Sequence, residues 1–254
     1  MCGKYIIILF VVFIFILSYY KSSNIEHFSP VDDLYDNIDI HVINLKSRPI
    51  KKKYIQKQFD EQNIKFNFFE AVDGNNLNPE SLIKKGIIDP GTSTKYSKRV
   101  LRKGEIGCSM SHVSIWMKLL NSNKKYALIF EDDAILCDNF KQKLYNTINE
   151  ANTTNWDVLY LNENCYNHFG KKCDGESVTE NIIRPRNVGY GLYGYIITKE
   201  GVKKLFKNVL PFIIPIDNYI IEKHMSDPNI IVLRLKTPIV GINRKFDSDT
   251  IAIK

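Results

Sequence analysis

Three consecutive carboxylates, Glu131, Asp132 and Asp133, could do chemistry because of where they stand in the sequence. This acidic triplet follows directly on the run 126–130 (YALIF), which is short and continuously apolar, as is typical of a strand buried on both faces. Ligands of open α/β sheets bind beyond the carboxyl ends of strands, where adjacent carboxylates repel one another. A divalent cation such as Mn²⁺ or Mg²⁺ would relieve that repulsion and keep positions open for phosphate oxygens. The alternative is an inert, solvated acidic turn that caps the next helix.

The elements around the triplet predict a single α/β domain. Short apolar runs alternate with helical periodicity from Ile38 onward, which favours a mostly parallel sheet covered by helices on both faces. The expected strands are 38–45, 64–68, 126–130, 156–161, 193–198 and 230–235. The expected helices follow Ser47 and Asn78 and occupy 105–120, 140–148, 199–209 and 218–225. The polar stretch 162–187 is expected to be a loop.

Two local details of this pattern can be checked. Ser47 is placed to cap the helix that follows it, with Pro49 in the first turn. The residues then expected on the buried side of that helix are Ile50, Tyr54, Ile55 and Phe59. In the helix 105–120, Cys108 and His112 lie four residues apart on one face. A metal pair would need two further ligands, so a packed histidine satisfied by backbone is the favoured interpretation.

The N-terminus contains an uncharged apolar segment, residues 5–20, between Lys4 and Lys21. As a helix it is about 24 Å long, slightly short of a ~30 Å hydrocarbon core, and the flanking lysines can snorkel to close the gap. We expect a transmembrane anchor at 5–20, a stem at 21–37 and a catalytic domain at 38–254; a cleaved signal peptide is the alternative. We expect a single-pass type II protein with its domain in the ER or Golgi lumen or an equivalent compartment, although the flanking charges are nearly balanced.

Composition and charge exclude several classes of protein. The 254 residues are 44% hydrophobic, 12% aromatic and 25% charged, which rules out a disordered or collagen-like chain. Five cysteines are too few to scaffold the fold. A net charge of +7 favours an anionic partner or substrate, but basic and aromatic residues do not interleave as in nucleic-acid binders, and no nucleic-acid partner is expected.

Four motifs together resemble glycosyltransferase family 25, which includes lipopolysaccharide glycosyltransferases and collagen galactosyltransferases. They are INL-x-x-R at 43–48, A-x-D-G at 71–74, GEIGCSMSH at 104–112 and EDD at 131–133. The resemblance continues through WDVLYL at 156–161, GYIITKEGVKKL at 194–205 and Pro215-Ile216-Asp217 to the tail at 248–251. It therefore covers the chain from Ile38 to the C-terminus.

The resemblance implies a GT-A-type nucleotide-diphosphosugar fold and an inverting, metal-dependent transferase. The donor would be a nucleotide sugar, a UDP-hexose carrying galactose or glucose, and the acceptor a hydroxyl of a glycan, a lipid-linked glycan or a protein. Asp133 and Glu131 would hold Mn²⁺ or Mg²⁺, and Asp132 would help to orient the site. The residues implied around the nucleotide are Arg48, Asp73, Glu105 and Glu131.

Inversion needs a carboxylate that takes the acceptor's proton from the opposite face of the sugar. Asp217, which follows Pro215 at the start of a helix, is the candidate base, and a helix N-cap is its alternative role. The chain departs from the family pattern at Ile50 and Lys51, where the family often has an acidic residue and a second arginine. Lysine cannot make the bidentate contact that arginine makes with phosphate, which weakens the expected contact there.

Two other functions remain open from the sequence. The first is a catalytically inactive family member that binds nucleotide or glycan as an adaptor. The second is a metal-dependent phosphoesterase that uses the same triplet, although such a site would normally want further histidine ligands, and only His112 lies near in sequence.

Overall fold

The computed structural model describes residues 34–90, 101–162, 174–186 and 189–250. The chain divides into two compact units, Met1–Asp36 and Asn37–Lys254, and the second contains the sheet and the site. The expected anchor at 5–20 lies outside the described residues, and of the expected stem only α2 (Leu34–Asn37) is described. None of the helices in the described ranges has both the length and the apolar character needed to cross a membrane.

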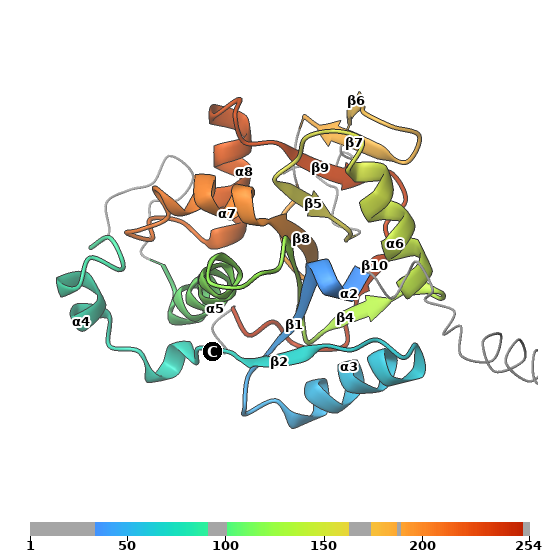
Figure 1. Cartoon of the computed structure of the whole chain (residues 1–254). Helices are drawn as coiled ribbons and strands as arrows, with labels where there is room; N and C mark the ends of the chain where they lie inside the picture. Colours follow the sequence, from blue (N-terminus) through green and yellow to red (C-terminus); the bar gives the residue numbers. More distant parts are fainter. Residues whose placement is uncertain (1–33, 91–100, 163–173, 187–188, 251–254) are drawn as a thin grey trace, which may run out of the picture. The chain divides into compact units, whose positions relative to one another are not determined.

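A large mixed sheet organises the second unit (Figure 1). In the described part of the chain its eight strands follow the order β2-β1-β3-β8-β5-β9-β7-β6. The strands are β1 (Ile38–Asn44), β2 (Asn67–Glu70), β3 (Tyr126–Glu131), β5 (Val158–Tyr160), β6 (Gly175–Ser177), β7 (Ile182–Pro185), β8 (Gly194–Thr198) and β9 (Val232–Leu235). A separate antiparallel pair joins β4 (Ala134–Leu136) to β10 (Val240–Ile242).

Most strands of the large sheet run in one direction, as predicted. β1 pairs in parallel with both β2 and β3, and β5 pairs in parallel with β9. β8 and β7 run the opposite way, since β8 is antiparallel to both β3 and β5, and β7 is antiparallel to both β9 and β6. The strand expected at 193–198 is therefore present, but it enters the middle of the sheet in reverse.

Helices cover both faces of the sheet, as predicted. They are α3 (Pro49–Glu61), α4 (Pro79–Lys84), α5 (Lys103–Leu120), α6 (Phe140–Ala151), α7 (Lys199–Phe206) and α8 (Ile216–Ser226), with the 3₁₀ turn η1 (Gly74–Asn76). Successive side chains of β3 point to opposite faces of the sheet, so they contribute to the core on both sides. Ala127 and Ile129 belong to the cluster formed with α5, α7 and α8, whereas Phe130 packs edge-on against Phe59 of α3 and Phe140 of α6.

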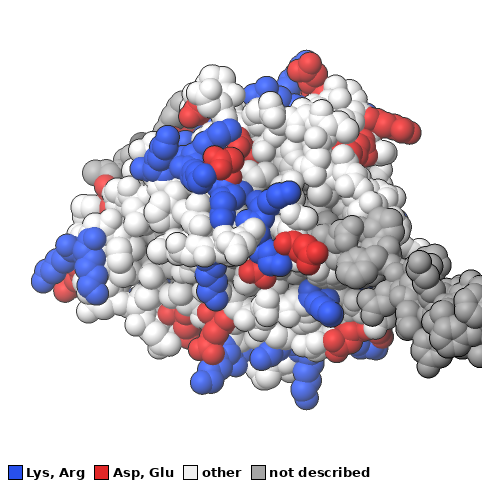
Figure 2. All heavy atoms as spheres, in the orientation of Figure 1, with Lys and Arg blue, Asp and Glu red and all other residues white. Residues whose placement is uncertain are grey.

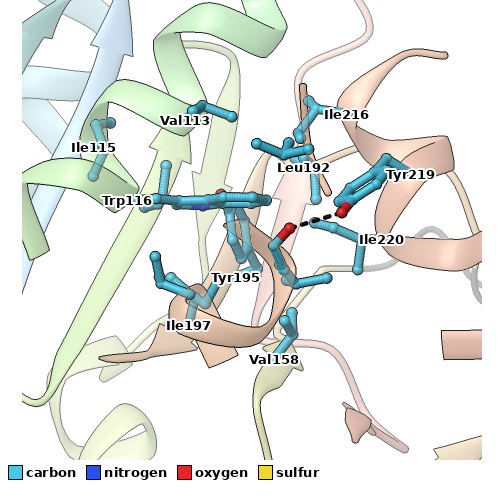
Figure 3. Packing of buried hydrophobic residues seen from close by; sticks show 14 of the residues in the cluster. Val113, Ile115, Trp116, Val158, Leu192, Tyr195, Ile197, Ile216, Tyr219 and Ile220 are labelled. Atoms are coloured by element: carbon cyan, nitrogen blue, oxygen red, sulfur yellow. Dashed lines mark hydrogen bonds between the residues drawn. The ribbon is translucent and has the colours of Figure 1, made fainter. Parts of the chain in front are cut away.

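The core beside α5 contains two fully buried aromatic residues that matter for the site. Trp116 of α5 lies next to Tyr195 of β8, among aliphatic side chains from both elements (Figure 3). The Trp116 Nε1 group donates to the Tyr195 hydroxyl at 3.0 Å. This hydrogen bond joins a helix to the reversed strand, and it satisfies a polar atom that burial would otherwise leave unpaired.

Three local expectations are wrong. Ile50 is 74% exposed and Lys51 only 5%, because the buried stripe of α3 follows the four-residue spacing of Lys51, Ile55 and Phe59. Arg48 is the N-cap of α3, with no side-chain cap, so Ser47 does not cap the helix. The stretch 162–187, expected to be a loop, contains β6 and β7.

Candidate active site

The carboxyl ends of three parallel strands meet at one edge of the sheet. Ile43 of β1 is in register with Glu131 of β3, and Asn44 with Glu70 of β2. The segments that leave these strands carry the motif residues Arg48, Asp73 and Asp132. A cavity of about 730 Å³ opens there, and it is also lined by the first turns of α5 and by residues 248–250 of the tail. The acidic triplet therefore lies at the end of a strand, as predicted, and the structure shows that it borders a cavity.

The three carboxylates of the triplet have different surroundings. Glu131 ends β3, and Asp132 and Asp133 are both buried. Asp132 Oδ2 accepts a hydrogen bond of 2.6 Å from Asn44 Nδ2, which fixes that carboxylate. Asp133 Oδ1 is buried and has no hydrogen-bond partner among the described residues. The triplet thus offers one anchored carboxylate and two with free coordination positions.

Burial raises the pKa of every carboxyl group in the triplet. The pKa of Glu131 rises to about 7, first through loss of solvent and then through the charges of Asp132 and Asp217. The pKa values of Asp132 and Asp133 rise to about 6, again mainly because the charged forms are desolvated. A bound cation would stabilise the ionised forms, so this electrostatic setting fits a metal site better than a solvated turn.

Lys51 supplies part of the missing positive charge. Its Nζ lies 2.8 Å from Asp249 Oδ2, 3.4 Å from Asp132 Oδ1 and 3.7 Å from Asp133 Oδ2. Burial by itself would lower the pKa of Lys51, but the hydrogen bond to Asp249 and the charges of the neighbouring aspartates raise it on balance. Arg48 holds Asp249 from the other side, donating from Nε to Oδ1 at 2.7 Å and contacting the same oxygen through Nη2. The tail is thereby tied to the loop after β1.

The other residues predicted around a nucleotide divide into two groups. Arg48, Asp73 and Glu131 line the cavity. Asp73 caps η1, and its Oδ1 accepts from the backbone N–H of Asn75 at 2.9 Å. Glu105 is not among the described lining residues; its Oε2 accepts from the Arg102 N–H at 2.8 Å and so completes the N-terminal cap of α5. A role for Glu105 at the nucleotide stays a prediction.

Asp217 is not among the described residues that line the cavity. It is the second residue of α8, whose N-cap is Pro215, and its carboxylate accepts from the N–H groups of Gly191 at 3.2 Å and Asn218 at 2.8 Å. Burial raises the pKa of Asp217, whose charge in turn contributes to raising the pKa of Glu131. The charge of Asp217 therefore acts on the triplet. The catalytic role of Asp217 stays a prediction.

Sequence reasoning missed Asn44, Asp249 and the surroundings of His112. His112 is fully buried, and its Nδ1 lies 3.0 Å from the Tyr195 hydroxyl, whereas a backbone partner was the favoured interpretation. Burial lowers the pKa of His112 to about 3, so the ring is neutral. Cys108 and His112 both line the cavity beside Glu131. The four-residue spacing on α5 is visible in the sequence, but the third group arrives from β3.

Comparison with known proteins decides the family. The profile described as "Glycosyltransferase family 25 (LPS biosynthesis protein)" matches residues 37–220, most of the chain. The chain belongs to glycosyltransferase family 25. The family resemblance predicted from the four motifs is thus confirmed, and the matched residues include the whole cavity edge apart from the tail. The prediction of a glycosyltransferase is confirmed at the level of the family.

Relatives carry names that span active and inactive proteins. A "Glycosyltransferase 25 family member" of Drosophila melanogaster is 34% identical over 75% of this chain and 31% of its own length. "Procollagen galactosyltransferase 2" of Homo sapiens is 30% identical over 75% of this chain and 31% of its own length. A "Probable inactive glycosyltransferase 25 family member 3" of Bos taurus is also 30% identical, over 75% of this chain and 32% of its own length. The chain spans about a third of the length of these curated relatives.

Solved structures are more distant. A glycosyltransferase involved in the glycosylation of the major capsid of PBCV-1 has a TM-score of 0.45 and 9% identity, covering 83% of this chain and 94% of that one. That likeness is too weak to bear on the fold or the activity of this chain.

Proposed function

We propose that this chain is the catalytic domain of a metal-dependent, inverting glycosyltransferase with a GT-A-type fold. It transfers a hexose from a nucleotide-diphosphate sugar to an acceptor hydroxyl. The observation that carries the proposal is the buried triplet at the carboxyl end of β3, facing a cavity, with Asp133 Oδ1 free of any described hydrogen-bond partner. Membership in family 25 supports the same reaction class.

Asp133 and Glu131 would hold Mn²⁺ or Mg²⁺. Their oxygen donors suit hard cations, and the unpartnered Asp133 oxygen and the raised pKa values of both carboxyl groups are consistent with such a ligand set. When bound, the cation would neutralise charge that develops on the departing diphosphate. Asp132, held by Asn44, orients the pair instead of binding the ion directly.

The cationic side chains of the same edge bind the donor's phosphates. Arg48 is a third exposed and lines the cavity, so its guanidinium can turn from Asp249 toward a phosphate oxygen. Lys51 is buried among carboxylates and contributes charge without the two-pronged geometry of arginine. Asp73, on the rim formed by η1, faces the same space and can accept from a donor hydroxyl.

Asp217 acts as the base in this proposal. The acceptor oxygen forms a bond to the anomeric carbon as the bond to the diphosphate oxygen breaks, and the acceptor's proton passes to the Asp217 carboxylate. Attack from the face opposite the leaving group gives inversion. The raised pKa of Asp217 makes its carboxylate a stronger base than an exposed aspartate.

The proposed donor, acceptor and membrane setting are supported by the sequence and by the name of one relative. The hexose is galactose or glucose carried by UDP, and the acceptor is a glycan, a lipid-linked glycan or a protein; a human relative bears the name procollagen galactosyltransferase. Residues 5–20 anchor the protein, as a type II membrane protein, with the catalytic domain on the non-cytosolic side. The competing proposal is an inactive adaptor, which the name of the bovine relative favours.

Replacing Asp133 tests the enzymatic proposal. Asp133→Asn keeps the shape of the side chain but removes a charged ligand, so Mn²⁺-dependent release of nucleotide from a panel of nucleotide sugars should fall at least a hundredfold. The melting temperature should stay within a few degrees of wild type. The matched control is Asp138→Asn, an exposed carboxylate five residues further on, which should keep full activity. An adaptor would bind the donor in both proteins and release no nucleotide from either.

Replacing Asp217 tests the base. Asp217→Asn should lower kcat by two orders of magnitude or more while the donor KM changes less than threefold, because proton removal and not donor binding is lost. Glu222→Gln, on the same helix, is the control and should leave both constants unchanged. An unchanged kcat in Asp217→Asn would leave Asp217 with only its hydrogen bonds to Gly191 and Asn218.

A further inference from the structure

Cys108, His112 and Glu131 converge at the floor of the cavity. Cys108 and His112 lie one turn apart on α5, and Glu131 ends the neighbouring strand β3. One ligand atom from each, the thiol sulfur, an imidazole nitrogen and a carboxylate oxygen, lie within 4.8 Å of one another. All three residues line the cavity, so the space beyond them is open to solvent or substrate.

The imidazole nitrogen that faces this group makes no hydrogen bond within the described part of the chain. His112 is 0% exposed, and its Nε2 makes no hydrogen bond with any described residue. Its distance to Glu131 Oε1 is 3.5 Å, longer than a well-formed N–H···O bond. Nitrogen and oxygen ligands of a tetrahedral zinc ion are themselves about 3.4 Å apart, given zinc–ligand bonds of about 2.0–2.2 Å. The distance between His112 Nε2 and Glu131 Oε1 therefore matches two ligands of one zinc ion better than a direct hydrogen bond.

The opposite side of the His112 ring is already held in place. Its Nδ1 lies 3.0 Å from the Tyr195 hydroxyl, which also accepts from Trp116 Nε1 at 3.0 Å. Trp116 and Tyr195 are both fully buried (Figure 3). Histidines that bind metals usually make such a bond through the second nitrogen, because it fixes the tautomer and the direction of the ring. The core thus aims Nε2 at Cys108 and Glu131.

We propose that Cys108, His112 and Glu131 form a Zn²⁺ site whose fourth position faces the cavity. Sulfur, nitrogen and oxygen together suit zinc, whereas Mn²⁺ and Mg²⁺ prefer oxygen ligands alone. On binding, zinc takes the place of the thiol proton of Cys108, which passes to solvent. Glu131 is shared with the proposed Mn²⁺ site, so zinc binding withdraws a ligand from that site and inhibits transfer; this consequence rests on the proposed function.

Cobalt absorption of the full-length chain tests the site directly. Co²⁺ added to the chain should give a thiolate-to-metal charge-transfer band with the intense visible bands of a tetrahedral ion, and Zn²⁺ should displace them. Cys108→Ser should lose the charge-transfer band. His112→Gln should weaken Zn²⁺ binding at least tenfold. Cys137→Ser, which removes a described cysteine outside the cavity lining, is the matched control and should keep the whole spectrum.

Clear results would overturn the site. A wild-type chain without the charge-transfer band, or a band that persists in Cys108→Ser, would place cobalt elsewhere. If His112→Gln does not fold because the Tyr195 hydroxyl loses one of its two partners, Cys108→Ser still decides, since this half-buried residue changes only sulfur to oxygen. Asp133→Asn separates the two proposals: it should lose Mn²⁺ binding and keep the cobalt spectrum. If Asp133→Asn retains Mn²⁺-dependent activity, the proposed function fails while the zinc site stands.

Discussion

Lys51 places a positive charge inside the acidic edge, with Nζ between 2.8 and 3.7 Å from oxygens of three aspartates. Together with Arg48 it faces four carboxylates, those of the triplet and of Asp249, so these six side chains carry a formal charge of −2. One divalent cation would balance that charge. The lysine is therefore compatible with a metal at the triplet. Without a metal, its charge reduces the repulsion between the neighbouring carboxylates.

Removing the Lys51 charge should destabilise the metal-free protein. Lys51→Met keeps much of the volume but leaves Asp132 and Asp133 without their cation and Asp249 with Arg48 alone. Losing one member of a buried charge group costs about 3–5 kcal/mol. Urea unfolding at neutral pH measures the loss, and Mn²⁺ should restore part of it by binding only the folded state.

The control for Lys51 is Lys57→Met, on the same helix. Lys57 is exposed, and among the described residues it forms an ion pair only with the exposed Glu61. Its removal should therefore change the free energy of unfolding by no more than about 0.5 kcal/mol. If Lys51→Met is as stable as Lys57→Met, the Lys51 ammonium is solvated and the charge balance above is wrong.

At the scale of elements, α5 connects the parts of the site. Its Ser111 Oγ accepts from the Val72 N–H at 2.9 Å, and its Ser109 Oγ accepts from the Ile216 N–H at 3.2 Å. Gly107 lies against η1 so closely that a Cβ would meet Val72 O at 2.4 Å and Gly74 N at 2.9 Å. The helix thus holds both the loop that carries Asp73 and the start of α8.

Gly107→Ala should disturb the site as well as the fold. The added methyl group meets backbone atoms that cannot rotate away, so η1 must shift, at a cost of about 1–3 kcal/mol. Because η1 carries Asp73 to the cavity, the donor KM should rise severalfold, measured by nucleotide release at varied donor concentration.

Gly86→Ala is a control of the same kind. Gly86 has φ +65°, and no atom lies within 4 Å of an added Cβ, so alanine costs about 1–2 kcal/mol through the backbone alone. Its donor KM should equal that of wild type. Equal donor KM values in the two variants would mean that η1 does not position donor-binding groups.

At the scale of the whole molecule, the net charge of +7 is not concentrated at the cavity. Figure 2 shows Lys and Arg side chains gathered over the region of α7 and α8 on the face drawn. Part of this charge is used within the domain: Lys204 binds both carboxylate oxygens of Asp157 at 2.8 Å, and Lys203 pairs with Glu200. The basic character of the chain therefore does not by itself identify a partner.

The domain should fold without the N-terminal apolar segment. The described sheet and core begin at Ile38, and the family match begins at residue 37. Deleting residues 1–24 should give a monodisperse protein in detergent-free buffer with the nucleotide-release rate of the full-length protein in detergent. Size-exclusion chromatography and the release assay measure both properties. A folded but inactive product would mean that these residues do more than tether the domain, and an aggregated one would contradict independent folding.

Local patterns in the sequence determined most of the elements. The strand 126–130 was predictable because a strand buried on both faces has a continuous apolar run. The helix 105–120 was predictable because its apolar residues recur along one stripe. The triplet's place at a strand end followed from the same reasoning. It was harder to predict which side of α3 is buried, because Ile50 and Lys51 are neighbours in the sequence. Lys51 is buried beside aspartates that come from the turn after β3 and from the tail, and only the tertiary structure brings these together.

Only the tertiary structure decided which distant groups meet. Lys51 and Asp249 are 198 residues apart in sequence, and His112 and Tyr195 are 83 apart. The reversed direction of β8 and the short strands in 162–187 likewise depend on pairing partners that no local pattern specifies. Periodicity reports the burial of a segment, whereas contacts between segments depend on strand order and on the packing of helices across the sheet. Strand order and helix packing together bring Lys51 and Arg48 to the carboxylates of the cavity. They also bring Cys108, His112 and Glu131 together.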